Sequence, residues 1–174
     1  HKSIVEYEKV VGKQTENLFD ASGHGTGLFK IIEKIVPNAQ FLIVKALDDY
    51  GHADVKSIYK ALFLCKHNNV DIVVMSFSSK SQLNVAVQEL LDSMMNDYNV
   101  IMTSSLGNDD RNIKTYPSGY QGILSVGAVS SDLTTRYPKS TFRTDTDSVA
   151  IGKTEEVDVD GTSLANAIFA GQIA

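Results

Sequence analysis

Two short stretches of this sequence carry residue types that can transfer protons and attack carbonyl groups. His24 lies in the first, SGHGTGLF at residues 22–29, between glycines and just before an apolar run. Three glycines in five residues are unfavourable for ordinary packing, because glycine loses more backbone entropy on folding than other residues. A histidine that exchanges protons with a nucleophile needs a near-neutral pKa and open space at one edge of its ring. The small neighbours of His24 leave that space open.

Ser163 lies in the second stretch, GTSLA at residues 161–165, which opens an Ala-rich apolar run. A serine at a helix start is surrounded by unpaired N–H groups and the positive end of the helix dipole, which favour a developing oxyanion. Asn108, in SSLGND, would supply a side-chain amide as a second donor. Each residue also has an ordinary role, as a helix cap, a turn former or a surface group. Their combination in one chain is what predicts a catalytic site.

The glycines also allow a different interpretation, a loop that binds a nucleotide phosphate. Such loops leave a strand, enter a helix and bring backbone N–H groups close to the phosphate. The residues before His24, ENLFDAS, make a poor strand, and the spacing is GxGxG rather than GxGxxG. No Lys-Ser or Lys-Thr pair follows. Because of these mismatches, a nucleotide-binding α/β protein ranks third among the hypotheses for function, after the two that are given below.

The candidate residues must be positioned by a fold in which strands and helices alternate. Short apolar runs, which predict buried strands, occur at residues 41–46, 71–77, 99–104 and 122–129. Apolar residues at helical spacing lie between the first three runs, at Ile58, Leu62 and Cys65 and at Val87, Leu90, Leu91 and Met94. Residues 130–160 are expected to form irregular connections with one or two short strands. A buried helix is expected to begin at residue 161.

This order predicts an α/β fold with three layers, in which helices cover both faces of a mostly parallel, twisted sheet. Parallel strands joined by right-handed crossovers place their carboxyl ends at one edge, where ligands usually bind. The loops at 76–81 and 104–110 follow two of the predicted strands at that edge. Both are small and polar, so we expect the site there.

The composition fits one globular domain and excludes several functional classes. The 174 residues are 43% hydrophobic and 21% charged, with a formal net charge of −5. The sequence has no cluster of Lys and Arg residues, so neither nucleic acid nor an anionic membrane is indicated as a partner. The single cysteine, Cys65, excludes an internal disulfide and any multi-cysteine metal site. No run predicts a membrane span or a signal peptide in this chain, so secreted and cytoplasmic locations both stay open.

Six stretches, in order, resemble the successive blocks of the subtilisin-like serine proteases. They read GHGTG, IVPNAQFLIVKALDDYG, NNVDIVVMSFSS, VIMTSSLGND, YPSGYQGILSVGAV and DGTSLA. Together they cover most of residues 21–174. The resemblance implies one subtilisin-like peptidase domain over residues 1–174, which we expect to be incomplete at both ends.

The resemblance also implies a role for each matching residue. His24 would be the general base, Ser163 the nucleophile and Asn108 the side-chain donor of the oxyanion hole. The walls of the substrate cleft and specificity pocket would be Ser76, Phe77 and Ser78 on one side and Ser104, Ser105, Leu106 and Gly107 on the other. Phe77 and Leu106 suggest an apolar component to that pocket. The family position matched by Tyr116-Pro117 often has a cis peptide bond.

One part of the family pattern is missing from these residues, the catalytic Asp on a strand well before the histidine. Asp20 lies four residues before His24 in a predicted loop and is not favoured as its replacement. We expect the acid upstream of residue 1. Without it, rates in such enzymes fall by about 10⁴-fold, so the fragment alone would be weak or inactive. A pseudoprotease that binds peptides or serves as a scaffold is therefore the second hypothesis. A further departure is Gly27, where the family often has a second histidine.

The partners implied by the resemblance are a peptide or protein substrate in extended conformation and the protein's own propeptide. Nucleic acid and membrane are not expected. The mechanism requires no cofactor. Many members of the family bind calcium, but none of the acidic runs here has the spacing of a calcium loop, so no metal site is predicted.

Overall fold

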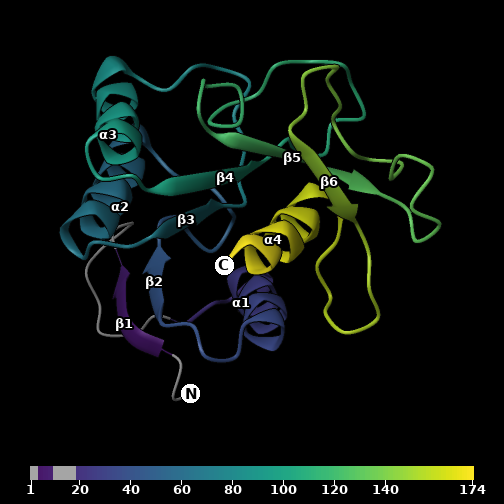
Figure 1. The fold of residues 1–174 in the computed structure, drawn as a ribbon, viewed down its shortest axis with the longest axis horizontal. Coiled ribbons are helices and arrows are strands. Elements are labelled where there is room, and N and C mark those ends of the chain that lie inside the picture. Colours follow the sequence, from purple (N-terminus) through teal and green to yellow (C-terminus); the bar gives the residue numbers. More distant parts are fainter. Residues whose placement is uncertain (1–3, 10–18) are drawn as a thin grey trace.

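Strands and helices alternate along most of the chain in the computed structural model, which describes residues 4–9 and 19–174 (Figure 1). The elements are β1 (Ile4–Lys9), α1 (His24–Ile35), β2 (Phe41–Lys45), α2 (Val55–His67), β3 (Ile72–Met75), α3 (Val85–Asn96), β4 (Ile101–Ser105), β5 (Leu124–Val129), β6 (Ser148–Ile151) and α4 (Gly161–Ile173). Every strand and helix expected from the apolar patterns is present. The strand β1 was not predicted, because its residues mix charged and apolar types.

Among the described residues the strands pair in parallel, but they form two sheets rather than one. One sheet has the order β3-β4-β5-β6, and the other pairs β1 with β2. The expectation that the strand at 41–46 joins the same sheet as that at 71–77 is therefore wrong. β2 points in a different direction from β3 (Figure 1), and a hydrogen-bonded ladder needs strands that run side by side about 4.8 Å apart.

Helices α2 and α3 cover one face of the four-stranded sheet. Each has a side-chain N-cap, since the Asp54 carboxylate accepts from Ser57 N at 2.7 Å and Asn84 Oδ1 accepts from Val87 N at 3.0 Å. The face predicted for the second helix is buried against the sheet, with Val87, Leu90, Leu91 and Met94 all in the core cluster. These caps and this face explain why both helices could be located from the sequence.

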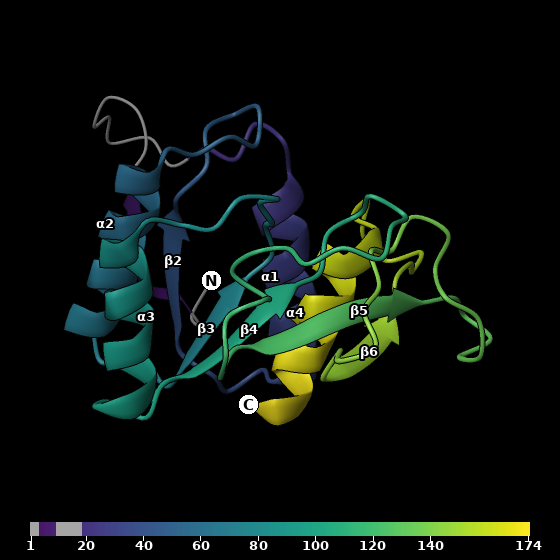
Figure 2. The same cartoon turned by 90° about the horizontal axis from the view of Figure 1, so that it is seen from above.

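Helices α1 and α4 pack together on the opposite face, which confirms the three-layer arrangement (Figure 2). A Cβ on Gly27 would lie 2.6 Å from Val159 Cγ2, just before α4 begins. A Cβ on Gly171, near the end of α4, would lie 3.0 Å from Ile35 at the end of α1. Both helices therefore start at the same end of the pair. His24 is the first residue of α1 and Ser163 the third of α4, so both stand at that end.

Candidate active site

The hydroxyl of Ser163 lies between the first turn of α4 and the loop that follows β3. Ser163 Oγ donates to the carbonyl oxygen of Ser76 at 3.3 Å, and Ser76 Oγ donates back to the Ser163 carbonyl at 3.2 Å. Asn166, one turn further along α4 and fully buried, donates from Nδ2 to Ser76 Oγ at 3.1 Å. Ser76, expected in the cleft wall, thus also fixes α4, the helix that carries Ser163, to the sheet edge.

Asn108 lies over the start of α4, where its amide is held in one orientation. Its Oδ1 accepts from Thr162 N at 3.0 Å and from Thr162 Oγ1 at 3.2 Å. A Cβ on Gly161 would overlap the Asn108 carboxamide, so the bare glycine permits this close approach. With Oδ1 engaged, Nδ2 is the edge of the amide left for a ligand, as an oxyanion donor requires.

Thr162 connects Asn108 and the loop after β4 to the start of α4, although the sequence analysis did not single it out. Its side chain is fully buried. Besides bonding Asn108, its Oγ1 accepts from Gly107 N at 3.0 Å, which ties the loop after β4 to α4. The available signal was its place directly before Ser163 in GTS, at a helix start where a hydroxyl commonly binds backbone N–H groups.

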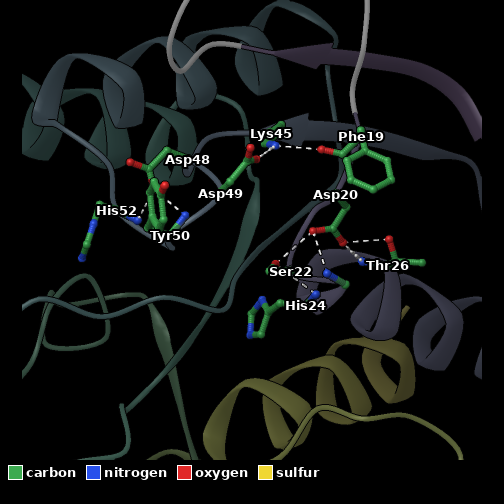
Figure 3. A network of polar contacts seen from close by, with 11 residues as sticks. Phe19, Asp20, Ser22, His24, Thr26, Lys45, Asp48, Asp49, Tyr50 and His52 are labelled. Carbon is green, nitrogen blue, oxygen red and sulfur yellow. Dashed lines mark hydrogen bonds and ion pairs between the residues drawn. The ribbon is translucent and has the colours of Figure 1, made fainter.

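His24 is exposed at the first position of α1, behind a turn that Asp20 stabilises (Figure 3). One Asp20 oxygen accepts from Ser22 Oγ at 3.0 Å and Gly23 N at 3.1 Å. The other accepts from Thr26 N at 2.8 Å and Thr26 Oγ1 at 2.7 Å. Gly23 adopts a φ of +70°, a left-handed conformation that glycine takes without steric cost. Both carboxylate oxygens are therefore occupied, and Asp20 acts as a cap of α1.

The pKa values of these two residues reflect that arrangement. Partial burial of Asp20 opposes its charged form, but the hydrogen bonds from Thr26, Ser22 and Gly23 outweigh burial and lower its pKa. Desolvation lowers the pKa of His24 below its ordinary value, and the negative charge of Asp20 raises it by a smaller amount. A lower pKa favours the neutral imidazole, the state that a general base requires.

The turn before His24 is also joined to the end of β2. Lys45 Nζ donates to the carbonyl oxygen of Phe19 at 2.8 Å and pairs with Asp49, and Figure 3 shows this side chain reaching between them. Asp48 closes the following turn by accepting from Tyr50 N and His52 N, both at 2.9 Å. The loop that follows β2 is thus fixed beside the loop that carries His24.

The residues expected to line the cleft differ in how far a ligand could reach them. Ser78 is exposed, whereas Ser76 and Phe77 are half-buried and Phe77 packs against the core cluster. The opposite wall is almost fully buried, with exposed fractions of 0%, 2% and 1% for Ser104, Ser105 and Leu106. Gly107 is buried as well.

The structure therefore brings together Ser163, Asn108 and the two loops, and it places His24 at the same end of the α1–α4 pair. Within residues 4–9 and 19–174, no hydrogen bond joins His24 to Ser163, and no carboxylate is hydrogen-bonded to the His24 ring. The predicted cis bond at Tyr116-Pro117 is confirmed. The glycine stretch follows a turn rather than a strand, as α1 begins at His24 itself. That geometry does not match a phosphate loop.

The sequence model of the subtilase family matches residues 6–174. This chain belongs to the subtilase family. The family membership confirms the resemblance seen in the six ordered blocks.

Individual proteases are similar to this subtilase over much of its length. The minor extracellular protease Epr of Bacillus subtilis (strain 168) is 30% identical over 128 residues, covering 67% of this chain and 19% of that protein. The alkaline protease of Alkalihalobacillus alcalophilus is 26% identical over 172 residues, covering 89% of this chain and 44% of that protein. The chain thus spans less than half the length of these two relatives.

A solved structure shows the same fold. The crystal structure of a cold adapted subtilisin-like serine proteinase superposes with a TM-score of 0.83 at 20% identity, covering 97% of this subtilase chain and 66% of that one. In the part of the chain that the structure describes, no helix is long and apolar enough to cross a membrane. The same residues contain no group of three or more His, Cys, Asp or Glu side chains placed to hold a metal ion.

Proposed function

We propose that this subtilase domain, spanning residues 1–174, is the part of a serine endopeptidase that carries the nucleophile, the general base and the oxyanion donor. The observation that carries the proposal is the parallel packing of α1 against α4, which puts His24 and Ser163 at one end of the helix pair. The fixed Asn108 amide beside Ser163 supports it. Acyl transfer needs these three groups around one carbonyl.

The reaction would proceed through an acyl-enzyme. Ser163 Oγ attacks the peptide carbonyl carbon while His24 takes the hydroxyl proton, and the resulting oxyanion is bound by Asn108 Nδ2 and Ser163 N–H. The C–N bond then breaks as His24 gives its proton to the leaving amine. Water, deprotonated by His24, attacks the ester, and His24 returns the proton to Ser163 Oγ as the acid product leaves. This scheme uses no cofactor.

We further propose that a segment outside these 174 residues supplies the carboxylate that orients His24. Two observations support this. Asp20 is fully used in capping α1, and β2 and β3 each have one edge that pairs with no strand among the described residues. An additional strand there would join the two sheets and end near His24. The encoded residues directly before His1 test this, since the family pattern predicts an apolar strand ending in Asp-Ser-Gly or Asp-Thr-Gly.

A peptide or protein substrate would bind in extended form along the loops 76–81 and 104–110, with the propeptide as a further partner. One observation favours a second candidate function, the peptide-binding pseudoprotease. Ser163 Oγ is hydrogen-bonded to the Ser76 carbonyl and not to His24. The same flanking sequence discriminates, because an upstream Asp-Ser-Gly or Asp-Thr-Gly strand would contradict the pseudoprotease.

Labelling with a fluorophosphonate probe tests the proposed function, because the probe reacts with an activated serine and not with an ordinary one. The full-length protein should be labelled, and the Ser163→Ala variant should not. The Ser131→Ala variant is a matched control, since Ser131 is an exposed loop serine, and it should be labelled like the wild type. Labelling that is absent, or that persists in Ser163→Ala, would contradict the proposal.

A further inference from the structure

We propose that the Ser78 side chain, in contact with Gly107, fills the pocket beside Ser163 and that the Lys80–Asp109 ion pair neutralises the charge there, so that the pocket favours small, uncharged side chains. The side chain in question belongs to the residue on the amino side of the scissile bond, here called the acyl residue. This inference rests on the proposed function and adds the class of substrate to it.

The position of Ser163 identifies which loops the acyl residue must contact. Ser163 Oγ is hydrogen-bonded to Ser76 in the loop after β3, and Asn108, which is hydrogen-bonded to the preceding residue Thr162, belongs to the loop after β4. A peptide carbonyl held between Ser163 Oγ and Asn108 Nδ2 therefore places its own side chain between these two loops. Their separation sets the size of side chain that can enter.

Ser78 brings the two loops into direct contact. A Cβ on Gly107 would lie 2.7 Å from Ser78 Oγ and 3.4 Å from Ser78 Cβ, so the serine side chain rests on the bare face of the glycine. Thr141 holds that face in place, since its N–H donates to the Gly107 carbonyl at 2.9 Å and its Oγ1 accepts from Asp109 N at 3.1 Å. With Gly107 fixed, the Ser78 side chain occupies space that an acyl side chain would need.

The Lys80–Asp109 ion pair joins the same loops further along. Lys80 Nζ lies 2.7 Å from Asp109 Oδ1, with side-chain exposures of 62% and 31%. The lysine neutralises the charge of the Asp109 carboxylate, which would otherwise attract a basic acyl residue. Because an ion pair near the surface is weak, it disfavours basic acyl residues without excluding them completely.

The two apolar residues expected in this pocket, Phe77 and Leu106, pack against the interior of the protein. Leu106, expected to give the pocket an apolar component, is 1% exposed, and its Cδ1 points toward β5, 3.4 Å from where a Cβ on Gly127 would be. Phe77 packs into the core beside α2 and α3. The geometry thus favours alanine, glycine or serine as the acyl residue over leucine, phenylalanine, lysine or arginine.

Peptide hydrolysis by the full-length protein tests this inference. In a series that varies only the acyl residue, kcat/KM for alanine should exceed that for phenylalanine by at least about tenfold, as expected where a filled pocket rejects bulk. The Ser78→Gly variant should raise the ratio of kcat/KM for phenylalanine to that for alanine by about tenfold. The Ser131→Gly variant, altered in an exposed loop outside the two cleft loops, should keep the wild-type ratio.

The Lys80→Ala variant should raise kcat/KM for arginine by up to about fivefold, since it leaves Asp109 without its partner. Lys60→Ala, on the exposed side of α2, should not. A wild type that cleaves after phenylalanine as fast as after alanine, or a preference that neither Ser78→Gly nor Lys80→Ala changes, would overturn the inference. If no peptide is cleaved and no fluorophosphonate label appears on Ser163, the proposed function itself has failed.

Discussion

Asp20 influences His24 in two separate ways, as a cap and as a charge. Its carboxylate receives the hydrogen bonds that shape the turn before α1, and its negative charge raises the pKa of His24 against the larger effect of desolvation. Because neither oxygen is free for the imidazole, Asp20 is a positioning residue rather than the acid of the proposed triad.

The Asp20→Asn substitution should therefore change both the pH profile and the stability of the full-length protein. Removing the charge lowers the pKa of His24, so the acidic limb of the kcat/KM profile should move to lower pH. The lowered pKa of Asp20 means that its carboxylate stabilises the fold at neutral pH and that this contribution is lost as pH falls through its pKa. Loss of the cap should cost about 1 kcal/mol at pH 7, measured by urea unfolding.

Asp48→Asn is a matched control, because Asp48 also caps a turn in the neighbouring loop. It should leave the acidic limb in place. A limb that does not move in Asp20→Asn, or moves equally in both variants, would contradict the electrostatic role of Asp20.

The Asn108→Ala variant tests whether the Asn108 side chain is the oxyanion donor. If the amide donates to the oxyanion, which exists only after attack, kcat should fall while KM changes little. We expect a loss of about 10²–10³ in kcat, the magnitude known for the equivalent change in subtilisin, a related enzyme. Asn112→Ala, in the exposed part of the same connection, should be neutral. A kcat unchanged by Asn108→Ala would show that the amide does not contact the oxyanion.

At the scale of elements, the close contact of α1 with the chain entering α4 positions His24 relative to Ser163. Gly27 makes that contact possible, because Val159 Cγ2 occupies the place where a Cβ would be. This explains physically why this chain has glycine where the family often has a histidine. A larger side chain would push the two helices apart at the end that carries the site.

Gly27→Ala should lower the free energy of unfolding by about 1–3 kcal/mol, since overpacking outweighs the better helix propensity of alanine. Gly25→Ala is the matched comparison within the same helix turn, because the nearest atom to its Cβ would be 3.6 Å away. That change should be neutral or stabilise by about 0.5–1 kcal/mol. Thermal unfolding of both variants measures the difference, and equal shifts would contradict the proposed close contact.

The elements that could be predicted from sequence are those whose signals are local. Helices α2 and α3 have caps and apolar faces within their own residues, and β2, β3, β4 and β5 have short apolar runs. The strand β1 and the pairing of β2 were missed because neither has a signal within its own residues. Strand pairing depends on partners distant in sequence, and a run such as IVEYEK contains no signal for its partner.

At the scale of the whole molecule, the six ordered blocks predicted His24, Asn108 and Ser163, but not how they are held. The contacts of Thr162 with Asn108 and Gly107, and of Ser78 with Gly107, join loops that are far apart in the chain. They arise only when the sheet edge and α4 come together. The candidate residues could therefore be named from the sequence, whereas the contacts that hold them could be seen only in the fold.

The most direct test of the account compares kcat in the full-length protein for His24→Ala, Ser163→Ala and the double variant. If Ser163 is the nucleophile and His24 its base, each single change should abolish the same step, and the double variant should be no slower than either one. Residual activity would then reflect only binding and the oxyanion hole. Losses that multiply in the double variant, or activity that survives in Ser163→Ala, would contradict the central claim that these two residues act as one catalytic unit.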